Sequence, residues 1–275
     1  ISAAGEDAVR PRVAVGPKGA VAVWKHYLTG DAAHGSTWEI DAARLPRIGG
    51  RWRRPVKIGR ETDGSFFPGE IPGPQVAVDA KGAATAVWTG SLRGDIVARS
   101  AFQPTGEAWR HPVAISAIGQ GTFPAIAISP RGSAAAVWER ASDGSQVVMA
   151  ASRPKPGGRW GAPTRLSAAG ADSYQPRIAT RSGGSAIVVW TTKDPARQMV
   201  PGVYQNGGYT IYATARPSIA DDWPAPQAIS PSGKNVGLGD VEMNLHGSAI
   251  AAWQRPGEDG TIVQAAAYAP GPGTS

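Results

Sequence analysis

Two short phrases recur along this chain, and they restrict its fold more than any other feature. The first phrase runs from Pro through a hydrophobic-Ala-x step and a Gly-centred turn to an Ala-rich stretch that ends on Trp. The second has the form Trp-x-x-Pro-x-x-Ile/Leu and alternates with the first. The Trp residues are Trp24, Trp88, Trp138, Trp190 and Trp253 in the first phrase, and Trp52, Trp109, Trp160 and Trp223 in the second. Such a period predicts a propeller, a solenoid or an array.

The third copy predicts four short antiparallel strands. The expected strands are residues 124–128, 134–138, 146–152 and 160–167. Pro130 and Gly132 form the first turn between them, and Asp143-Gly144 is the dipeptide most typical of a hairpin. Four short strands per repeat are typical of a propeller blade.

We therefore predict an all-β fold: one five-bladed β-propeller of four-stranded antiparallel blades over residues 1–275. The expected blades are residues 8–59, 72–117, 124–168, 176–230, and 240–275 together with 1–5. The repeating Trp side chains are expected to be wedges between blades, each burying about 200 Å². Because the second phrase occurs only four times, the last blade is either incomplete or closed by the N-terminal stub. Alternatively, the natural polypeptide is longer and the ring holds six or seven blades.

Composition excludes several classes of protein. The absence of Cys excludes disulfides and thiolate metal sites, and no apolar run is long enough to span a membrane. The net charge of +7 is spread along the chain, apart from Arg51, Arg53 and Arg54 around Trp52. No nucleic-acid motif accompanies these charges. The chain begins at Ile1, which we interpret as trimming during export, and we expect a secreted or cell-surface protein of bacterial type.

The turn that precedes the second phrase resembles the turn of the Asp-box propellers. The matching residues are Gly49-Gly50-Arg51-Trp52, Gly106-Glu107-Ala108-Trp109 and Gly157-Gly158-Arg159-Trp160. That family includes sialidases and sugar-binding propeller lectins. The Ser and Asp of the family's turn are missing here, and only Asp221-Asp222-Trp223 keeps an acid nearby. The resemblance implies a propeller fold and a carbohydrate ligand.

Long loops are expected on one face only, where the second strand joins the third and one blade joins the next. Aromatic and polar side chains gather in these loops, as sugar rings require. The candidate ligand-binding residues there are His26, Tyr27, Phe66, Phe67, Phe123, Tyr174 and Tyr204, with Asn206 beside the last of them.

A second set of candidates opens the first strand of each blade and is expected to line a central funnel. These residues are Arg12, Gln75, Ala125, Arg177 and Asp240. Arg binds carboxylates bidentately, so the pair of Arg suits an acidic sugar. Glu242 replaces the small Ala of the repeat, and an acid at a packed position predicts either an ion pair or a raised pKa.

The candidate catalytic acids are Glu242, Asp240 and Glu70, with Glu61 and Asp63 on the same loop as Glu70. Glycosidases need two carboxyl groups, but no motif selects a pair here. The sequence favours a non-catalytic, lectin-like propeller that binds a polysaccharide or glycan. The alternatives are a glycoside hydrolase or polysaccharide lyase acting at the funnel mouth, and a protein-interaction module that accepts a strand from another chain at the last blade. No metal, cofactor or specific nucleic acid is expected.

Overall fold

The structure is a computed structural model that describes residues 1–31, 35–62, 72–142, 144–194, 208–232 and 236–270. Blade 1 contains β1 (Asp7–Gly16), β2 (Gly19–Asp31), β3 (Gly35–Leu45) and β4 (Val56–Thr62). Blade 2 contains β5 (Gln75–Val78), β6 (Ala84–Leu92), β7 (Asp95–Gln103) and β8 (Val113–Ala114). Blade 3 contains β9 (Thr122–Ile128), β10 (Ala134–Ser142), β11 (Ser145–Arg153) and β12 (Thr164–Arg165).

The remaining strands form two more sheets. Blade 4 contains β13 (Ser173–Thr180), β14 (Ala186–Lys193), β15 (Tyr209–Arg216) and β16 (Gln227–Ala228), and blade 5 contains β17 (Gly237–Met243), β18 (Ala249–Pro256) and β19 (Thr261–Tyr268). Within each of the five sheets, neighbouring strands follow chain order and pair antiparallel. The predicted all-β fold of propeller blades is confirmed. In the described part of the chain, no helix is long and apolar enough to cross a membrane.

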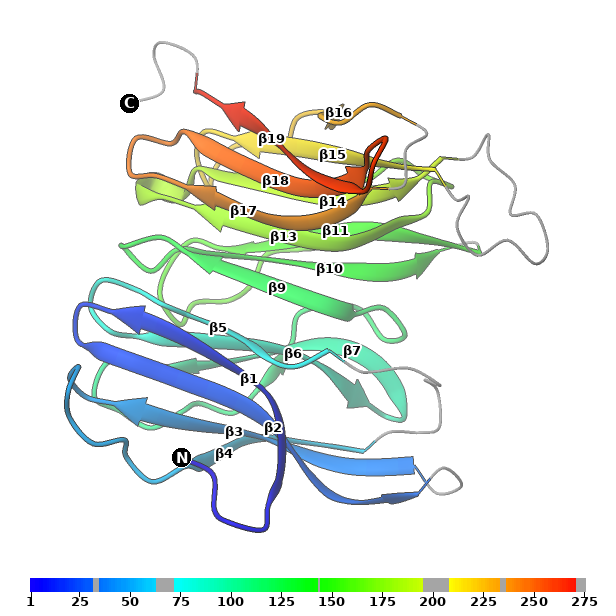
Figure 1. The fold of residues 1–275 in the computed structure, drawn as a ribbon. Helices are drawn as coiled ribbons and strands as arrows, with labels where there is room; N and C mark the ends of the chain where they lie inside the picture. The colour runs from blue at the N-terminus through cyan, green and yellow to red at the C-terminus, as the bar shows by residue number, and fades with distance from the viewer. Residues whose placement is uncertain (32–34, 63–71, 143, 195–207, 233–235, 271–275) are drawn as a thin grey trace.

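The blades follow one another in chain order, with blade 1 at the bottom of Figure 1 and blades 4 and 5, which overlap in this view, at the top. Their contact surfaces are the hydrophobic core. The predicted Trp wedges are buried in it: Trp24, Trp88, Trp138, Trp190 and Trp253 are all at most 4% exposed. Trp88, for example, packs with Ala84 and Ala86 of its own blade against Val21 and Ile40 of blade 1. Burial of these small and aromatic residues therefore fixes how each blade lies on the one before it.

Two local predictions were wrong. The fourth strand of blade 3 is much shorter than expected, since β12 is only Thr164–Arg165 and Trp160 precedes it. The long loop that was expected to carry His26 and Tyr27 is instead part of a hairpin in which β2 pairs with β3. The stub Ile1–Gly5 forms no strand, and no described residue pairs with the outer edge of β19. Among the described residues blade 5 therefore has three strands, in agreement with the expectation of an incomplete last blade rather than one closed by the N-terminal stub.

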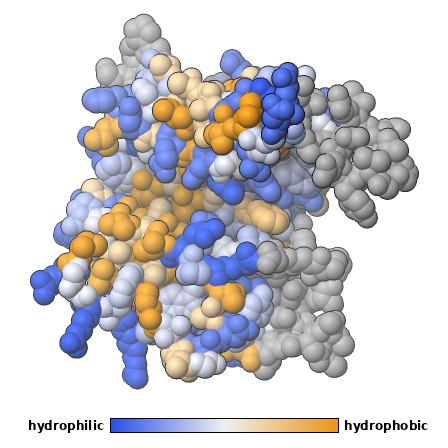
Figure 2. Space-filling view, viewed as in Figure 1, coloured by the Kyte–Doolittle hydropathy of each residue, from blue (hydrophilic) through white to orange (hydrophobic). Residues whose placement is uncertain are grey.

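The row of blades does not close on itself. Each blade packs against the next, from β1 on β5 to β13 on β17, whereas among the described residues no such packing joins blade 5 back to blade 1. Val13 and Val15 of β1 are consequently 60% and 67% exposed. The space-filling view shows apolar surface gathered over the region where β1 and β5 lie in Figure 1 (Figure 2).

An irregularity recurs where the innermost strand of a blade begins. The pairing of β1 with β2 shifts register between Val9 and Arg12, and that of β13 with β14 shifts between Tyr174 and Arg177. Such a bulge leaves one residue unpaired and changes the direction of its side chain.

Candidate functional site

The innermost strands of all five blades surround a cavity of about 790 Å³, which we call the central cavity. The five predicted funnel residues all line it, one from each blade: Arg12, Gln75, Ala125, Arg177 and Asp240. The two Arg side chains each donate to the carbonyl of the neighbouring Pro, at 3.3 Å from Arg12 and 3.2 Å from Arg177. Neither guanidinium forms an ion pair with a carboxylate of the described residues. Both remain available to an anionic group in the cavity.

The recurring bulges place further side chains on this cavity. Arg10, Phe123 and Gln175 have positive φ angles of 55°, 50° and 54°, each directly before the Pro of the repeat. A left-handed backbone at residues other than Gly costs of order 1 kcal/mol or more, and such strain often accompanies functional sites. All three residues line the central cavity. The repeat thus bends the chain to direct large side chains toward it.

Glu242 also lines the central cavity, but not as the sequence predicted. It is exposed, although the matching Ala127 and Ala179 are 9% and 7% exposed. These Ala residues lie against the next blade, and no further blade covers Glu242. The premise of a buried acid is therefore wrong, because the position is packed only where another blade follows.

A second cavity of about 540 Å³, the side cavity, opens on the face of the expected long loops. Its walls come from blades 2, 3 and 4. They include the carboxyl groups of Asp95 and Glu139 and the rings of Phe123 and Tyr174. Phe123 lines both cavities, so they adjoin at this residue.

Glu139 is the most perturbed acid of the side cavity. The residue is only 4% exposed, and its Oε1 accepts a hydrogen bond of 2.7 Å from the backbone N–H of Gln175. That N–H is free to donate because the bulge in β13 removes Gln175 from the strand ladder. Burial raises the pKa of Glu139 to about 7, and the hydrogen bond from Gln175 and the charge of Arg177 only partly oppose this. Glu139 is therefore protonated in mildly acidic solution.

Sequence reasoning missed Glu139 and Asp95. A usable signal existed for Glu139, because it directly follows the wedge Trp138 on a strand that pairs on both sides. The matching residues Thr89 and Thr191 are 5% exposed, so this position is buried in the inner blades. A carboxyl group at such a position is costly unless it is neutral or paired. Asp95 follows a Gly in an ordinary hairpin and offered no comparable signal.

Tyr174 contributes a neutral phenol to the side cavity. Burial is the largest cause that raises the pKa of its hydroxyl to about 12, and the charge of the neighbouring Asp172 and a hydrogen bond to it act in the same direction. Asp172 is held in place by the backbone N–H of Gln146, which donates to its Oδ1 at 3.0 Å. Tyr174 thus presents a ring and a hydroxyl donor without a charge, as sugar-binding sites often do.

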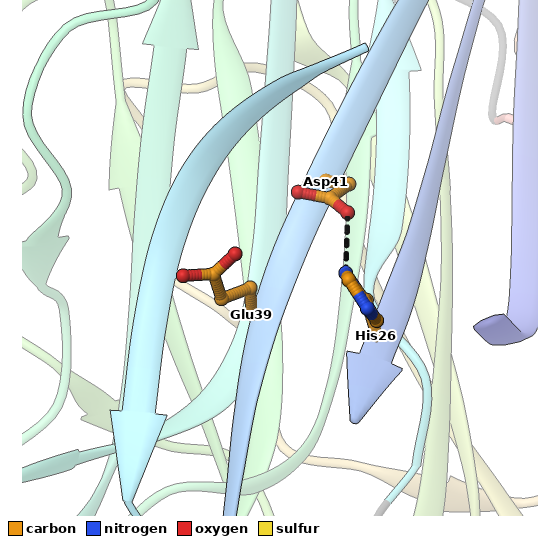
Figure 3. A group of neighbouring side chains, drawn as sticks. All are labelled: His26, Glu39 and Asp41. Carbon is orange, nitrogen blue, oxygen red and sulfur yellow. Dashed lines mark hydrogen bonds and ion pairs between the residues drawn. The ribbon is translucent and has the colours of Figure 1, made fainter. Parts of the chain in front are cut away.

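The two candidates on blade 1, His26 and Tyr27, do not line either cavity. The ring of His26 is directed at Asp41, with its Nδ1 3.2 Å from Oδ2 (Figure 3). Tyr27 lies beside the buried Lys25, whose Nζ is 3.0 Å from the Tyr27 hydroxyl and 4.0 Å from the centre of the Trp38 ring. Both candidates stabilise blade 1 through these contacts.

His26, Glu39 and Asp41 are a group that sequence reasoning missed, with ligand atoms all within 4.8 Å of one another. Such a set has the donor types of a metal site. Two contacts already use these donors, since Lys57 Nζ lies 2.6 Å from Glu39 Oε1 and His26 bonds Asp41. Burial raises the pKa of Asp41, while His26 lowers it. The contacts of Glu39 with Lys57 and of Asp41 with His26 therefore make this group a cross-strand network of ion pairs.

Glu61, another candidate acid, has a structural role. Its side chain is fully buried and accepts hydrogen bonds from Trp88 Nε1 and the backbone N–H of Ser91, both at 2.8 Å. It also pairs with Arg99 at 3.2 Å. These contacts join blade 1 to blade 2. The remaining candidates, Asp63, Phe66, Phe67, Glu70, Tyr204 and Asn206, lie outside the described residues.

Solved structures with this fold act on glycans. The GH93 α-L-arabinofuranosidase of Fusarium graminearum, solved with arabinobiose, is similar over 90% of this chain and 77% of its own, with 10% identity and a TM-score of 0.53. The α-L-arabinanase of Penicillium chrysogenum has 13% identity over the same shares of the two chains, with a TM-score of 0.49. No protein-family model matches the sequence, and neither does any of the curated proteins compared with it.

This comparison confirms the propeller fold that the Asp-box resemblance implied. It contradicts the prediction of a non-catalytic, lectin-like propeller, because the fold is shared with glycoside hydrolases. That prediction depended too much on the absence of a catalytic motif. In this structure the carboxyl groups that line the side cavity come from different blades, so no local motif could reveal them.

Proposed function

We propose that this protein is a glycoside hydrolase whose reacting groups line the side cavity. The observation that carries the proposal is Glu139, a buried carboxyl group with a pKa of about 7 in a cavity that also contains the exposed carboxyl group of Asp95. Glycosidases require one carboxylic acid to protonate the leaving oxygen and a second, ionised carboxylate. Different environments separate the two roles by separating the pKa values. The hydrolase neighbours support the same class of reaction.

In this proposal Glu139 is the general acid. The backbone N–H of Gln175 holds one of its oxygens, and the other is available to donate a proton to the glycosidic oxygen. Asp95 acts from the hairpin of blade 2, either on a water molecule or on the sugar itself. Phe123 and Tyr174 stack on the sugar rings and orient the bond between the two carboxyl groups.

The test is release of reducing ends from a panel of plant, bacterial and host polysaccharides by the wild type and two variants. Glu139→Gln and Asp95→Asn should each lower kcat by about 10²-fold or more, because each removes a group that acts in the transition state. Glu107→Gln, at an exposed acid that lines neither cavity, is the matched control and should retain activity. Wild-type kcat in Glu139→Gln would exclude this mechanism. Products that carry a new double bond would indicate a lyase instead.

We further propose that the substrate is an acidic glycan, since Arg12 and Arg177 line the central cavity and neither forms an ion pair with a carboxylate of the described residues. A uronic acid or another anionic sugar next to the scissile unit would meet them. Arg12→Ala should raise KM at least several-fold on an acidic polysaccharide and leave KM on a neutral one unchanged. Equal effects on both substrates would contradict an acidic substrate without affecting the assignment of Glu139. Export, as the sequence predicts, suits an enzyme that degrades such polymers.

A further inference from the structure

The face of blade 5 that points away from blade 4 is built like a buried face but is exposed. Ile250 occupies the position of Val21, Ala135 and Ile187 in earlier blades. Those three residues are 1%, 3% and 4% exposed, whereas Ile250 is 59% exposed. The next strand repeats the difference: Val263 is 76% exposed. Its counterparts Ile40, Ala98, Val148 and Ile211 are at most 2% exposed.

Blade 1 shows the complementary feature on its opposite face. Val13 and Val15 of β1 are 60% and 67% exposed, but the matching Val241 of β17 is only 3% exposed. The reason is position, since β17 lies against blade 4 and no described element lies on this face of blade 1. The two ends of the row therefore expose part of the two kinds of surface that meet at the inner junctions, although Trp24 itself is only 4% exposed.

The junctions between the inner blades show which kind of surface would pack on the exposed faces of blade 5 and blade 1. At each one, the face that carries a Val directly before the Trp packs on the Trp-bearing face of the following blade. Val87 and Ala98 of blade 2 pack on Trp138 of blade 3 in this way. Val137 and Val148 of blade 3 likewise pack on Trp190 of blade 4. Blade 5 thus offers a surface for a following Trp-bearing face, and blade 1 offers a surface for a preceding blade.

We infer that one further blade, a four-stranded antiparallel sheet of the same repeat, docks between blade 5 and blade 1 and completes the ring. The argument is continuity with the four existing junctions, which use the same positions on both sides. The fold neighbour is consistent with this, because the similarity covers 77% of that enzyme's chain and part of it has no counterpart among the five blades. In the same added segment, one strand ahead of this blade would pair with β19, which has no outer partner among the described residues. This inference does not depend on the proposed function.

A blade taken from this chain provides the test. Residues 104–167 contain β8 and all of blade 3, and Gln103 and Tyr268 occupy equivalent positions, opposite Ala84 and Ala249. Appending a copy of residues 104–167 directly after Tyr268 therefore supplies the missing outer strand and one complete blade. The control is the same extended chain with Ala136→Asp and Trp138→Asp in the appended copy only.

The readouts are hydrogen exchange of β1, β18 and β19, binding of a dye specific for exposed apolar surface, and sedimentation. The extended chain should remain a monomer, lose dye binding, and slow exchange in all three strands at least tenfold relative to both the wild type and the control. Protection that is no greater than in the control would overturn the inference. A wild-type dimer that already protects β18 and β19 would overturn it as well, because a second copy would then be the occupant.

Discussion

At the scale of single residues, two features determine the environment of Glu139: the bulge in β13 and the packing of blade 4 over its carboxyl group. The bulge in β13 gives Gln175 a left-handed backbone and frees its N–H for the Glu139 carboxyl group. Packing of blade 4 on blade 3 removes that carboxyl group from water, and this desolvation is the largest cause of its raised pKa. The same residue therefore links the fold to both stability and proposed chemistry.

The raised pKa predicts a pH dependence of folding. Glu139 has a pKa of about 7 in the folded protein against 4.5 without burial. The folded state therefore binds more protons in this interval, and the stability from this group, fully present below 4.5, is lost as pH rises through about 7. The loss amounts to roughly 3 kcal/mol for a shift of this size. Denaturant unfolding at about pH 5 and about pH 8 measures it.

Two variants make this prediction specific. Glu139→Gln should abolish most of the pH-dependent difference, because the amide does not ionise. Glu107→Gln, at an exposed acid of blade 2, should leave the difference as it is in the wild type. An unchanged pH dependence in Glu139→Gln would show that Glu139 does not titrate near neutrality.

At the scale of strands, each blade depends on the one that follows it for burial. Ile187 of β14 and Ile250 of β18 have the same place in the repeat and the same side chain. They are 4% and 59% exposed, because blade 5 covers the first and no described element covers the second. The repeat therefore provides a matched pair in which sequence is constant and burial differs.

Ile187→Ala should lower the free energy of unfolding by about 2–4 kcal/mol, since it removes buried methylenes and leaves a cavity. Ile250→Ala should cost less than about 0.5 kcal/mol, as exposed substitutions usually do. Denaturant unfolding of both variants under the same conditions is the measurement. Equal losses would mean that blade 5 is covered in solution.

The strands also show how far the sequence predicts this fold. The Trp and Ala positions were sufficient for strand order and for the inter-blade core, because burial repeats with them. The outer strands of blades 2, 3 and 4 were overestimated, since only two residues of each, such as Thr164 and Arg165, pair beyond the Trp-x-x-Pro turn. The β2–β3 hairpin was taken for a loop because polar residues occupy it. His26 and Glu39, for example, stand at opposite positions in the two strands.

At the scale of the whole molecule, five blades place two cavities next to each other. The funnel residues were predictable, because a position that varies within a constant repeat is not dictated by the core. The shared cavity of Glu139 and Asp95 was not predictable, since it depends on how blades 2, 3 and 4 lie against one another. Secretion of the protein stays a prediction.

The most direct test of the account is the structure of Glu139→Gln with an oligosaccharide that the wild type hydrolyses. The account predicts a sugar ring stacked on Phe123 and Tyr174 in the side cavity, with the glycosidic oxygen between position 139 and Asp95. An oligosaccharide bound only elsewhere, with the side cavity free of sugar, would contradict it.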